Sequence, residues 1–258
     1  MLALAKALVA SIGNLSFGPE VGVGPIKLDA PVIAPWLASV RAMAADLEEI
    51  QARGVRETPA TIHLADARQL GKVLQGGSVD AVITSPPYPN EKDYTRTTRL
   101  ESVLLGFIRD RADLRSLKRG LLRSNTRGVY KGDDDDRWAA HIPEVGRLAE
   151  EIEARRIALG KTSGFERMYA KVTRLYFGGM ARHLAELRWV LRPGARLAYV
   201  VGDQASYLRV MIRTGQLLAA IGRSLGYQVT GIDLHRTRLA TATREQLREE
   251  VVLFRWPG

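Results

Sequence analysis

A serine, two prolines and a tyrosine stand together at the end of an apolar run. The run covers residues 79–84 (VDAVIT), and Ser85, Pro86, Pro87 and Tyr88 follow it directly. The prolines fix φ and hold the backbone extended, and the first proline removes an N–H donor, which leaves nearby carbonyls free to accept hydrogen bonds. Tyr88 adds a flat aromatic face beside these acceptors. The segment is therefore suited to hold a flat, amino-bearing ring.

An amino group on a nucleobase is a poor nucleophile because its lone pair is conjugated into the ring. Acceptors for its N–H hydrogens allow the nitrogen to rehybridise toward a methyl donor. The Ser85 hydroxyl and the Pro86 carbonyl are the predicted acceptors, and Tyr88 is predicted to stack on a base flipped out of the duplex. The chemistry then rests on positioning rather than on a strong base. We assign Ser85, Pro86, Pro87 and Tyr88 to the catalytic site; the alternative is a rigid surface turn.

Hydrophobic periodicity and turn residues define the elements around this motif. The sequence predicts a helix over residues 36–52, strands over 61–64 and 79–84, a helix over 179–191, a strand over 195–201, a helix over 205–225, and strands over 227–232 and 250–254. Alternating strands and helices predict an α/β fold with a mostly parallel, Rossmann-like sheet covered by helices on both faces. The last two strands lack a helix between them and are predicted to form an antiparallel C-terminal edge.

Composition excludes several classes of protein. The chain has no cysteine, which rules out disulfides, thiolate catalysis and cysteine-bound metals. Four histidines without paired spacing, and four adjacent aspartates (133–136) without the spacing of a calcium loop, predict no metal site. No apolar run is long enough to span a bilayer, and Lys6 interrupts the apolar N-terminal stretch. We therefore expect a cytoplasmic protein without a membrane partner.

The charge balance points to a polyanionic partner. Lys and Arg number 38 against 28 Asp and Glu, a net charge of +10. Residues 91–131 hold eleven basic and five acidic residues, a net charge of +6. The sequence predicts a helical, basic insertion over residues 91–175 that contacts nucleic-acid phosphates; the alternative is a solvated lobe. The predicted contact residues are Lys118, Arg119, Arg123, Asn125, Arg127 and Lys131.

At this point the motif resembles a known family. Thr84 to Tyr88 (TSPPY) after a hydrophobic strand is similar to motif IV of the amino-directed DNA methyltransferases, and its serine is similar to the N4-cytosine branch rather than the N6-adenine branch. Residues 64–67 (LADA) resemble motif III, and residues 191–194 (LRPG) resemble the turn downstream of motif IV. The resemblance implies S-adenosylmethionine as cofactor, DNA as partner, and Asp66, Ala67 and Thr84 as cofactor-binding residues.

The family also has motif I, a strand followed by a glycine-rich loop and a helix. The candidate here is residues 17–24 (FGPEVGVG), from which Gly22 and Gly24 are predicted to approach the cofactor. This stretch runs into Pro25 rather than into a helix, so that a packed loop is the alternative. Three explanations stay open: a truncated product, a second polypeptide that supplies motif I, or a non-catalytic relative.

The sequence thus predicts a methyltransferase acting on the exocyclic amino group of a DNA base, as in restriction–modification systems, with N4 of cytosine favoured over N6 of adenine. The alternatives are a non-catalytic or truncated DNA-binding relative that needs a partner for cofactor binding, and an RNA or protein amino-methyltransferase. The predicted segments are 1–90, ending in motif IV, then the insertion 91–175, then 176–258.

Overall fold

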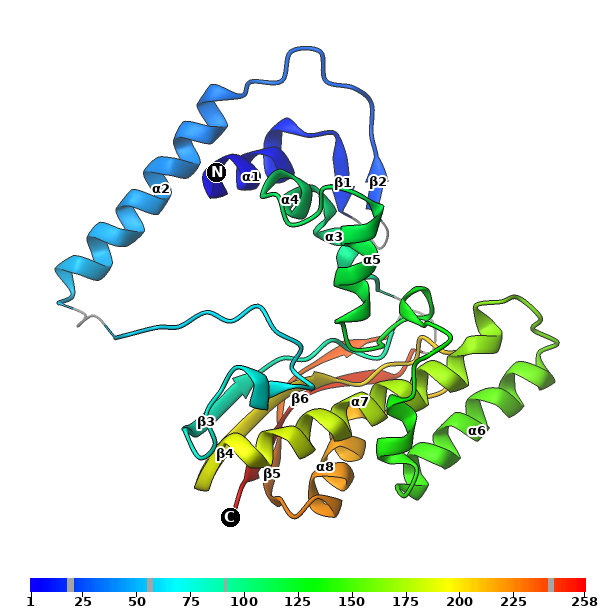
Figure 1. Ribbon diagram of the computed structural model, residues 1–258. Coiled ribbons are helices and arrows are strands. Elements are labelled where there is room, and N and C mark those ends of the chain that lie inside the picture. The colour runs from blue at the N-terminus through cyan, green and yellow to red at the C-terminus, as the bar shows by residue number, and fades with distance from the viewer. Residues whose placement is uncertain (18–20, 55–57, 91, 241–243) are drawn as a thin grey trace. The chain divides into compact units, whose positions relative to one another are not determined.

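The computed structural model describes residues 1–17, 21–54, 58–90, 92–240 and 244–258 (Figure 1). The chain divides into two compact units. The first unit comprises Met1–Ile62 and Asp93–Lys118, and the second unit comprises His63–Lys92 and Arg119–Gly258. These boundaries differ from the predicted segments 1–90, 91–175 and 176–258, because much of the predicted insertion packs into the core of the second unit: Val145, Ile152 and Ala170 belong to it.

The second unit is built on a mixed sheet. Its strands are β3 (Val79–Thr84), β4 (Leu191–Gly202), β5 (Gln228–Leu239) and β6 (Gln246–Arg255), in the order β3-β4-β6-β5. Strand β3 runs parallel to β4, whereas β6 is antiparallel to both β4 and β5. The α/β class and the antiparallel C-terminal edge are therefore confirmed, and the β3–β4 pair forms the parallel part.

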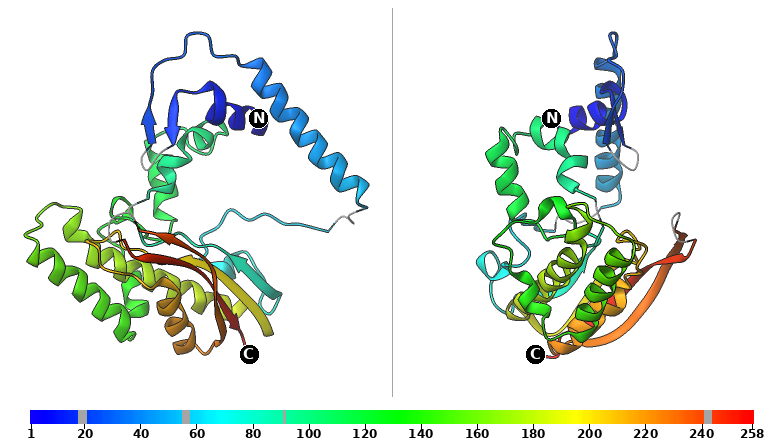
Figure 2. Two further views of the ribbon diagram at one scale, coloured as in Figure 1. Left: turned by 180° about the vertical axis from the view of Figure 1, so that it is seen from behind. Right: turned by 90° about the vertical axis from the view of Figure 1, so that its right-hand side faces the viewer.

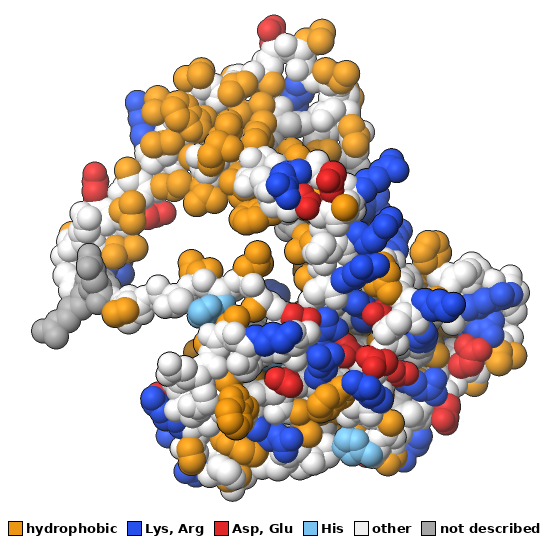
Figure 3. All heavy atoms as spheres, viewed as in Figure 1, with side chains coloured by type: hydrophobic (Ala, Val, Ile, Leu, Met, Phe, Trp, Pro, Cys, Tyr) orange, Lys and Arg blue, Asp and Glu red, His pale blue; other side chains and the backbone are white. Residues whose placement is uncertain are grey.

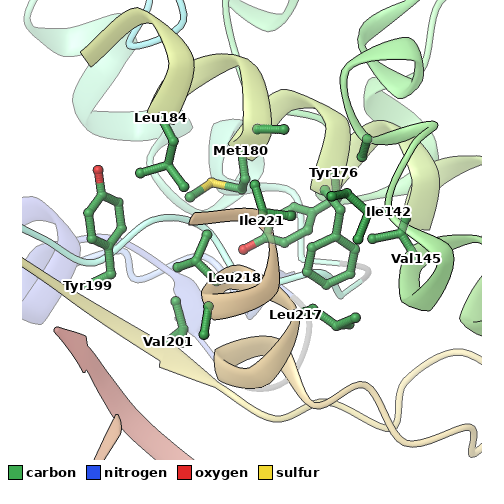
Figure 4. Packing of buried hydrophobic residues seen from close by; sticks show 14 of the residues in the cluster. Ile142, Val145, Tyr176, Met180, Leu184, Tyr199, Val201, Leu217, Leu218 and Ile221 are labelled. Atoms are coloured by element: carbon green, nitrogen blue, oxygen red, sulfur yellow. The ribbon is translucent and has the colours of Figure 1, made fainter. Parts of the chain in front are cut away.

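Helices α6 (Pro143–Ala158), α7 (Tyr169–Val190) and α8 (Thr214–Ser224) belong to the same unit. The core lies between these helices and one face of the sheet, as Figures 2 and 4 show. Along β4 every second side chain is buried against it, at Leu197, Tyr199 and Val201. Period-two burial of this kind is what a sheet with one covered face requires.

The opposite face of the sheet departs from the prediction of helices on both sides. Ile83 is 85% exposed there, in a strand that also contains the apolar residues Val79, Ala81 and Val82. Ala81, Ile83, Ala198 and Leu253 line a shallow hollow of about 630 Å³ on the sheet. Within the described residues, this face is open.

Three predicted elements need correction. Residues 61–64 form no strand; Ile62 and Leu64 are 96% and 92% exposed, and no described strand offers them a hydrogen-bonding partner. The helix predicted over 205–225 is shorter, because Leu208 and Arg209 have φ of 57° and 65°, values that a right-handed helix excludes. The helix predicted over 179–191 instead begins ten residues earlier, as α7.

The first unit contains short helices, a hairpin and one long helix. Its elements are α1 (Leu2–Ala7), a π-helical turn (Leu8–Ile12), β1 (Leu15–Phe17), β2 (Val21–Val23), α2 (Ile33–Ala52), α3 (Tyr94–Thr97), α4 (Arg99–Leu104) and α5 (Arg111–Arg119). Helix α2 confirms the predicted helix, and Pro35 lies in its first turn, where a missing N–H does no harm. No helix among the described residues is long and apolar enough to cross a bilayer.

Short 3₁₀ turns complete the second unit. They cover Leu70–Lys72, Thr126–Gly128, Asp135–Ala139 and Glu166–Met168. The turn at Asp135–Ala139 packs tightly on α7: a Cβ on Gly178 would lie 2.0 Å from the Asp135 carbonyl oxygen. Glycine at this helical position therefore permits the close approach of the Asp135 turn to α7, where Asp135 pairs with Arg182.

Candidate functional site

The Ser-Pro-Pro-Tyr motif leaves the sheet at the carboxyl end of β3, beside the parallel strand β4. Thr84, the last residue of β3, pairs with Tyr199 of β4, and β4 continues to Gly202. Ser85 is exposed, and Pro86 and Pro87 are half-buried. Ligands of α/β proteins bind at the carboxyl ends of such strands, so that the motif lies where a substrate site is expected.

A cleft of about 290 Å³ opens beside this strand end; we call it the motif cleft. Its walls bring together the predicted cofactor residues Asp66, Ala67 and Thr84 with the predicted catalytic residues Ser85, Pro86 and Pro87. The remaining lining residues, all from the second unit, are Ala65, Arg68, Gly120, Leu121, Leu122, Met180 and His183. Two segments assigned separately from the sequence thus share one concave site.

The predicted cofactor residue Asp66 is fixed by an arginine. Arg68 Nε lies 3.0 Å from Asp66 Oδ1, and Arg68 Nη2 lies 2.7 Å from Asp66 Oδ2. Burial alone would raise the pKa of Asp66, but the hydrogen bonds from Arg68 outweigh it and lower that pKa. Arg68 also bonds Asp135, which in turn accepts from Arg182 at 3.0 Å. The cleft wall therefore carries a carboxylate held in a network of buried ion pairs.

His183 of α7 is a site residue that the sequence prediction missed. Its Nδ1 lies 2.7 Å from the carbonyl oxygen of Ala67, and its Nε2 lies 2.7 Å from the hydroxyl of Tyr199. Because a carbonyl only accepts, Nδ1 carries the proton and Nε2 accepts from Tyr199. Burial lowers the pKa of His183 and keeps the ring neutral. No sequence spacing links these three residues, which come from a helix, a loop and a strand.

Tyr88 stands beside the motif cleft rather than in its wall. The ring is half-buried and lies outside the hydrophobic core. Its hydroxyl donates to Glu249 Oε1 at 2.6 Å, and a Cβ on Gly202 would lie 2.9 Å from Tyr88 Cε2. Glu249 is a second residue that the sequence prediction missed, because it lies 161 positions away in the chain.

The predicted phosphate contacts divide into two groups. Arg119, Arg127 and Lys131 are exposed. Arg123 and Asn125 are only 5% and 8% exposed, so that the structure does not present their side chains to a phosphate. Arg123 is turned inward to Asp133, with Nε 2.8 Å from Oδ2, and the Asn125 amide donates to the carbonyl of Lys92 at 3.2 Å.

Lys118 is also engaged within its own unit. Its Nζ lies 2.7 Å from Asp93 Oδ2, and only 18% of its side chain is exposed. Because Asp93 caps α3 and is itself 8% exposed, this ion pair holds the helix start in place. The phosphate contact predicted for Lys118 is therefore not supported. On the face drawn in Figure 3, basic and acidic side chains of the second unit are interspersed.

The predicted cofactor glycines have a local packing role. Gly22 lies in β2 and pairs with Ser16 of β1, and the Gly24 N–H donates to Asn14 at 2.6 Å. A Cβ on Gly22 would lie 2.7 Å from the Ser16 hydroxyl. After β2 the next described helix begins only at Ile33, so no helix follows the glycines directly. The cofactor contacts of Gly22 and Gly24 stay a prediction; residues 18–20 of that stretch lie outside the described residues.

Comparison with known proteins supports the resemblance seen in the motif. No family model matches the chain. The Type II methyltransferase M.AvaI of Nostoc sp. is 30% identical over 195 residues, which is 69% of this chain and 38% of that protein. M.BsoBI of Geobacillus stearothermophilus is 27% identical over 207 residues, or 71% and 40% of the two chains. These Type II DNA methyltransferases support the assignment of the chain to the amino-directed DNA methyltransferase family, and the chain spans about two fifths of their length.

Solved structures that align with this chain are more distant. A candidate DNA modification methylase from Thermus thermophilus is 17% identical, with 75% of this chain and 51% of that chain aligned at a TM-score of 0.35. The same protein complexed with S-adenosyl-L-methionine aligns over 76% and 55% of the two chains at a TM-score of 0.37.

Proposed function

We propose that this chain forms the base-presenting part of a DNA methyltransferase, which brings the exocyclic amino group of a base to S-adenosylmethionine. We favour N4 of cytosine over N6 of adenine, because the motif begins with serine. The observation that carries the proposal is the motif cleft, in which Asp66 and Ala67 face the Ser85–Pro87 elbow. A concave site with a few convergent polar groups at a strand end is the expected form of such a site.

The chain's own residues position the nucleophile. The Ser85 hydroxyl and the Pro86 carbonyl accept the two N–H hydrogens of the base, so that its nitrogen lone pair is no longer held in conjugation. Tyr88 supplies a ring beside them on which the extruded base stacks. Each of these groups acts by positioning the amino nitrogen in line with the methyl group. Holding two bound reactants in such a geometry contributes strongly to the rate.

The residues present fit part of the cofactor. Leu121, Leu122 and Met180 provide apolar surface for an adenine ring, and Asp66 provides a fixed carboxylate beside it. S-adenosylmethionine would supply an electrophilic methyl group on a sulfonium sulfur. Among the described residues no glycine-rich strand–loop–helix is found that would hold its methionine part. We therefore propose that the cofactor site is completed by a second polypeptide that carries motif I.

The uncovered face of the sheet supports the proposal of a second polypeptide. Parallel strands are ordinarily buried on both faces, yet β3 pairs with β4 alone among the described strands. Its exposed Ile83 borders the apolar hollow formed with Ala81, Ala198 and Leu253. A strand added parallel to the free edge of β3, with its helix over this face, would bury these side chains.

Calorimetry tests the need for a second polypeptide. S-adenosylmethionine is titrated into the folded chain by itself, with S-adenosylhomocysteine as a second ligand. We expect no heat of binding in the micromolar range. Tight binding by the chain alone would contradict the proposed partner while leaving the proposed chemistry intact.

A methyl-transfer assay tests the activity itself. The chain, together with a lysate of its source as supply of the partner, receives tritiated S-adenosylmethionine and unmethylated plasmid DNA, RNA or protein, with Ser85→Ala as the blank. We expect label in DNA that digestion and mass spectrometry identify as N4-methylcytosine. Label in RNA or protein alone would favour the corresponding amino-methyltransferase, and N6-methyladenine would overturn the base preference.

A non-catalytic, DNA-binding role is the second candidate, and the missing glycine loop is what favours it. Exposed Arg119, Arg127 and Lys131 would provide the phosphate contacts in either case. If the chain binds DNA but transfers no methyl group, whether or not the lysate is present, the result would favour this non-catalytic role. Action on chromosomal DNA would place the chain in the cytoplasm.

A further inference from the structure

Three residues on neighbouring strands form a row across the end of the sheet. Arg236 of β5 pairs with Glu249 of β6, and Glu249 pairs with Gly202 of β4. Directly paired residues of antiparallel strands present their side chains on the same face. The neighbouring Glu250 is buried on the helix side at 2% exposure, so the row belongs to the other face of the sheet.

Tyr88 lies against this row, and both its ring and its hydroxyl are in contact with it. Its ring packs on Gly202, where even a methyl group would come within 2.9 Å of Cε2. Its hydroxyl donates to Glu249 Oε1 at 2.6 Å. The second carboxylate oxygen of Glu249 accepts from Arg236 Nε. Glycine at 202 thus leaves room for the ring, and Glu249 sets where its hydroxyl points.

The direction of these hydrogen bonds is fixed by charge. The hydrogen bonds from Arg236 and then from Tyr88 lower the pKa of Glu249, so its side chain is a carboxylate at neutral pH. A carboxylate only accepts, and therefore the phenol must donate. Bonds to an ionised acceptor are shorter and stronger than those between neutral groups. The ring plane is consequently restrained before any base arrives.

We infer that Glu249 is a positioning residue, which orients Tyr88 for stacking on the extruded base. The inference rests on the proposed function for its role in methyl transfer, but the restraint itself belongs to the folded chain. Preorganised groups contribute to rate because no rearrangement is needed when the substrate binds. Arg236 supports the carboxylate from solvent, since its own side chain is 68% exposed.

Fluorine NMR tests the restraint without requiring activity. 3-Fluorotyrosine is introduced at position 88 of the full chain, and its spectrum is compared in the wild type, Glu249→Ala and Glu249→Gln. We expect a shifted, motionally averaged resonance for Glu249→Ala and a spectrum near the wild type for Glu249→Gln, whose amide oxygen still accepts. Glu151→Ala, the same change at an exposed position of α6, serves as control. An unchanged resonance in Glu249→Ala would overturn the inference.

A double-mutant cycle tests the catalytic consequence in the complete methyl-transfer assay. Glu249→Ala and Tyr88→Phe are each expected to lower kcat about tenfold with little change in KM, and the double variant to lose no more than either alone. Additive losses would show that Glu249 acts elsewhere and would overturn its role through Tyr88. If the fluorine spectra respond as expected while wild-type chain never methylates DNA, the proposed function fails and the restraint stands.

Discussion

His183, which lines the motif cleft, shares a hydrogen bond of 2.7 Å with Tyr199 and so connects α7 with β4. The same imidazole donates to the Ala67 carbonyl, so one neutral ring connects a helix, a strand and the motif III segment. Because each ring nitrogen is engaged in a defined direction, protonation of Nε2 would require the Tyr199 hydroxyl to turn from donor to acceptor. The hydrogen bonds of the neutral ring therefore depend on the protonation state of one side chain.

Stability is expected to fall as pH drops through the ordinary pKa of histidine. Burial lowers the pKa of His183 in the folded state, so the unfolded chain binds more protons near pH 6 and the free energy of unfolding rises with pH there. The slope attributable to this residue is at most about 1.4 kcal/mol per pH unit. Urea unfolding between pH 5 and 7.5 measures it, and His183→Gln should remove that component. An unaltered slope in the variant would contradict the neutral buried ring.

Tyr88→Ala is expected to reduce methyl transfer while leaving the fold intact. Base–aromatic stacking contributes about 1–3 kcal/mol, which corresponds to a loss of roughly 5- to 150-fold. The ring is only half-buried, so far-UV circular dichroism and the urea midpoint should change little. Tyr94→Ala, which removes an exposed ring from α3, is the matched control. Wild-type turnover in Tyr88→Ala would remove the stacking role.

Gly202→Ala is expected to displace the Tyr88 ring. The added methyl group would come within 2.9 Å of Cε2, closer than carbon atoms approach in packed proteins. Turnover should therefore fall although no polar group has been removed. Gly146→Ala in α6 has no atom within 4 Å of its new methyl group and should raise stability by about 0.5–1 kcal/mol. Equal behaviour of the two variants in the methyl-transfer assay would exclude the packing role of Gly202.

Arg68→Met is expected to destabilise the second unit strongly. Arg68 joins Asp66 and Asp135, whose side chains are 18% and 7% exposed, and its removal leaves two poorly solvated carboxylates without their shared partner. Loss of one member of a buried ion pair costs about 3–5 kcal/mol. Arg147→Met, which breaks an exposed pair with Glu144, should cost at most about 1 kcal/mol. A urea midpoint in Arg68→Met close to that of Arg147→Met would argue against the network.

The salt dependence of DNA binding tests the three exposed phosphate-binding candidates. Arg119, Arg127 and Lys131 are exposed, and their combined replacement by alanine should reduce the slope of log K against log salt by about 0.9 for each phosphate that is no longer neutralised. Arg123→Ala should instead lower stability without altering that slope, because its guanidinium is bound to Asp133. Fluorescence anisotropy with duplex DNA, at salt concentrations from about 50 to about 200 mM, distinguishes the two effects. An equal change in slope for Arg123→Ala would restore its predicted role at the interface.

Local sequence patterns predicted the strands of the sheet and the position of the motif at the end of one of them. The apolar run of β3 and the prolines after it defined one strand and its end, and the regular C-terminal elements defined three more. The interactions of Tyr88 with Glu249 and of His183 with Ala67 were inaccessible, because they join positions 161 and 116 residues apart. Such pairings follow from strand order and helix packing, which a single sequence leaves open.

Where the predictions differ from the structure, the cause is the same: the three-dimensional neighbours of a residue are not visible in the sequence. Arg123 and Asn125 lie in a basic stretch, and charge alone does not indicate which member turns inward to Asp133 or to a backbone carbonyl. The apolar residues Ile62 and Leu64 fit a strand, but a strand needs a neighbour, and the described residues offer none. A Cβ on Gly22 would meet the Ser16 hydroxyl, a local packing contact that composition cannot distinguish from ligand binding.

The unpaired edge of β3 also affects how the purified protein behaves at high concentration. Strand β3 is at the edge of the described sheet and carries the exposed Ile83, and an edge strand of this kind is a template on which a second molecule can extend the sheet. Concentrated samples should therefore self-associate and, on prolonged storage, form light-scattering aggregates. Ile83→Lys should keep such samples clear, as charged residues do along the margins of natural sheets.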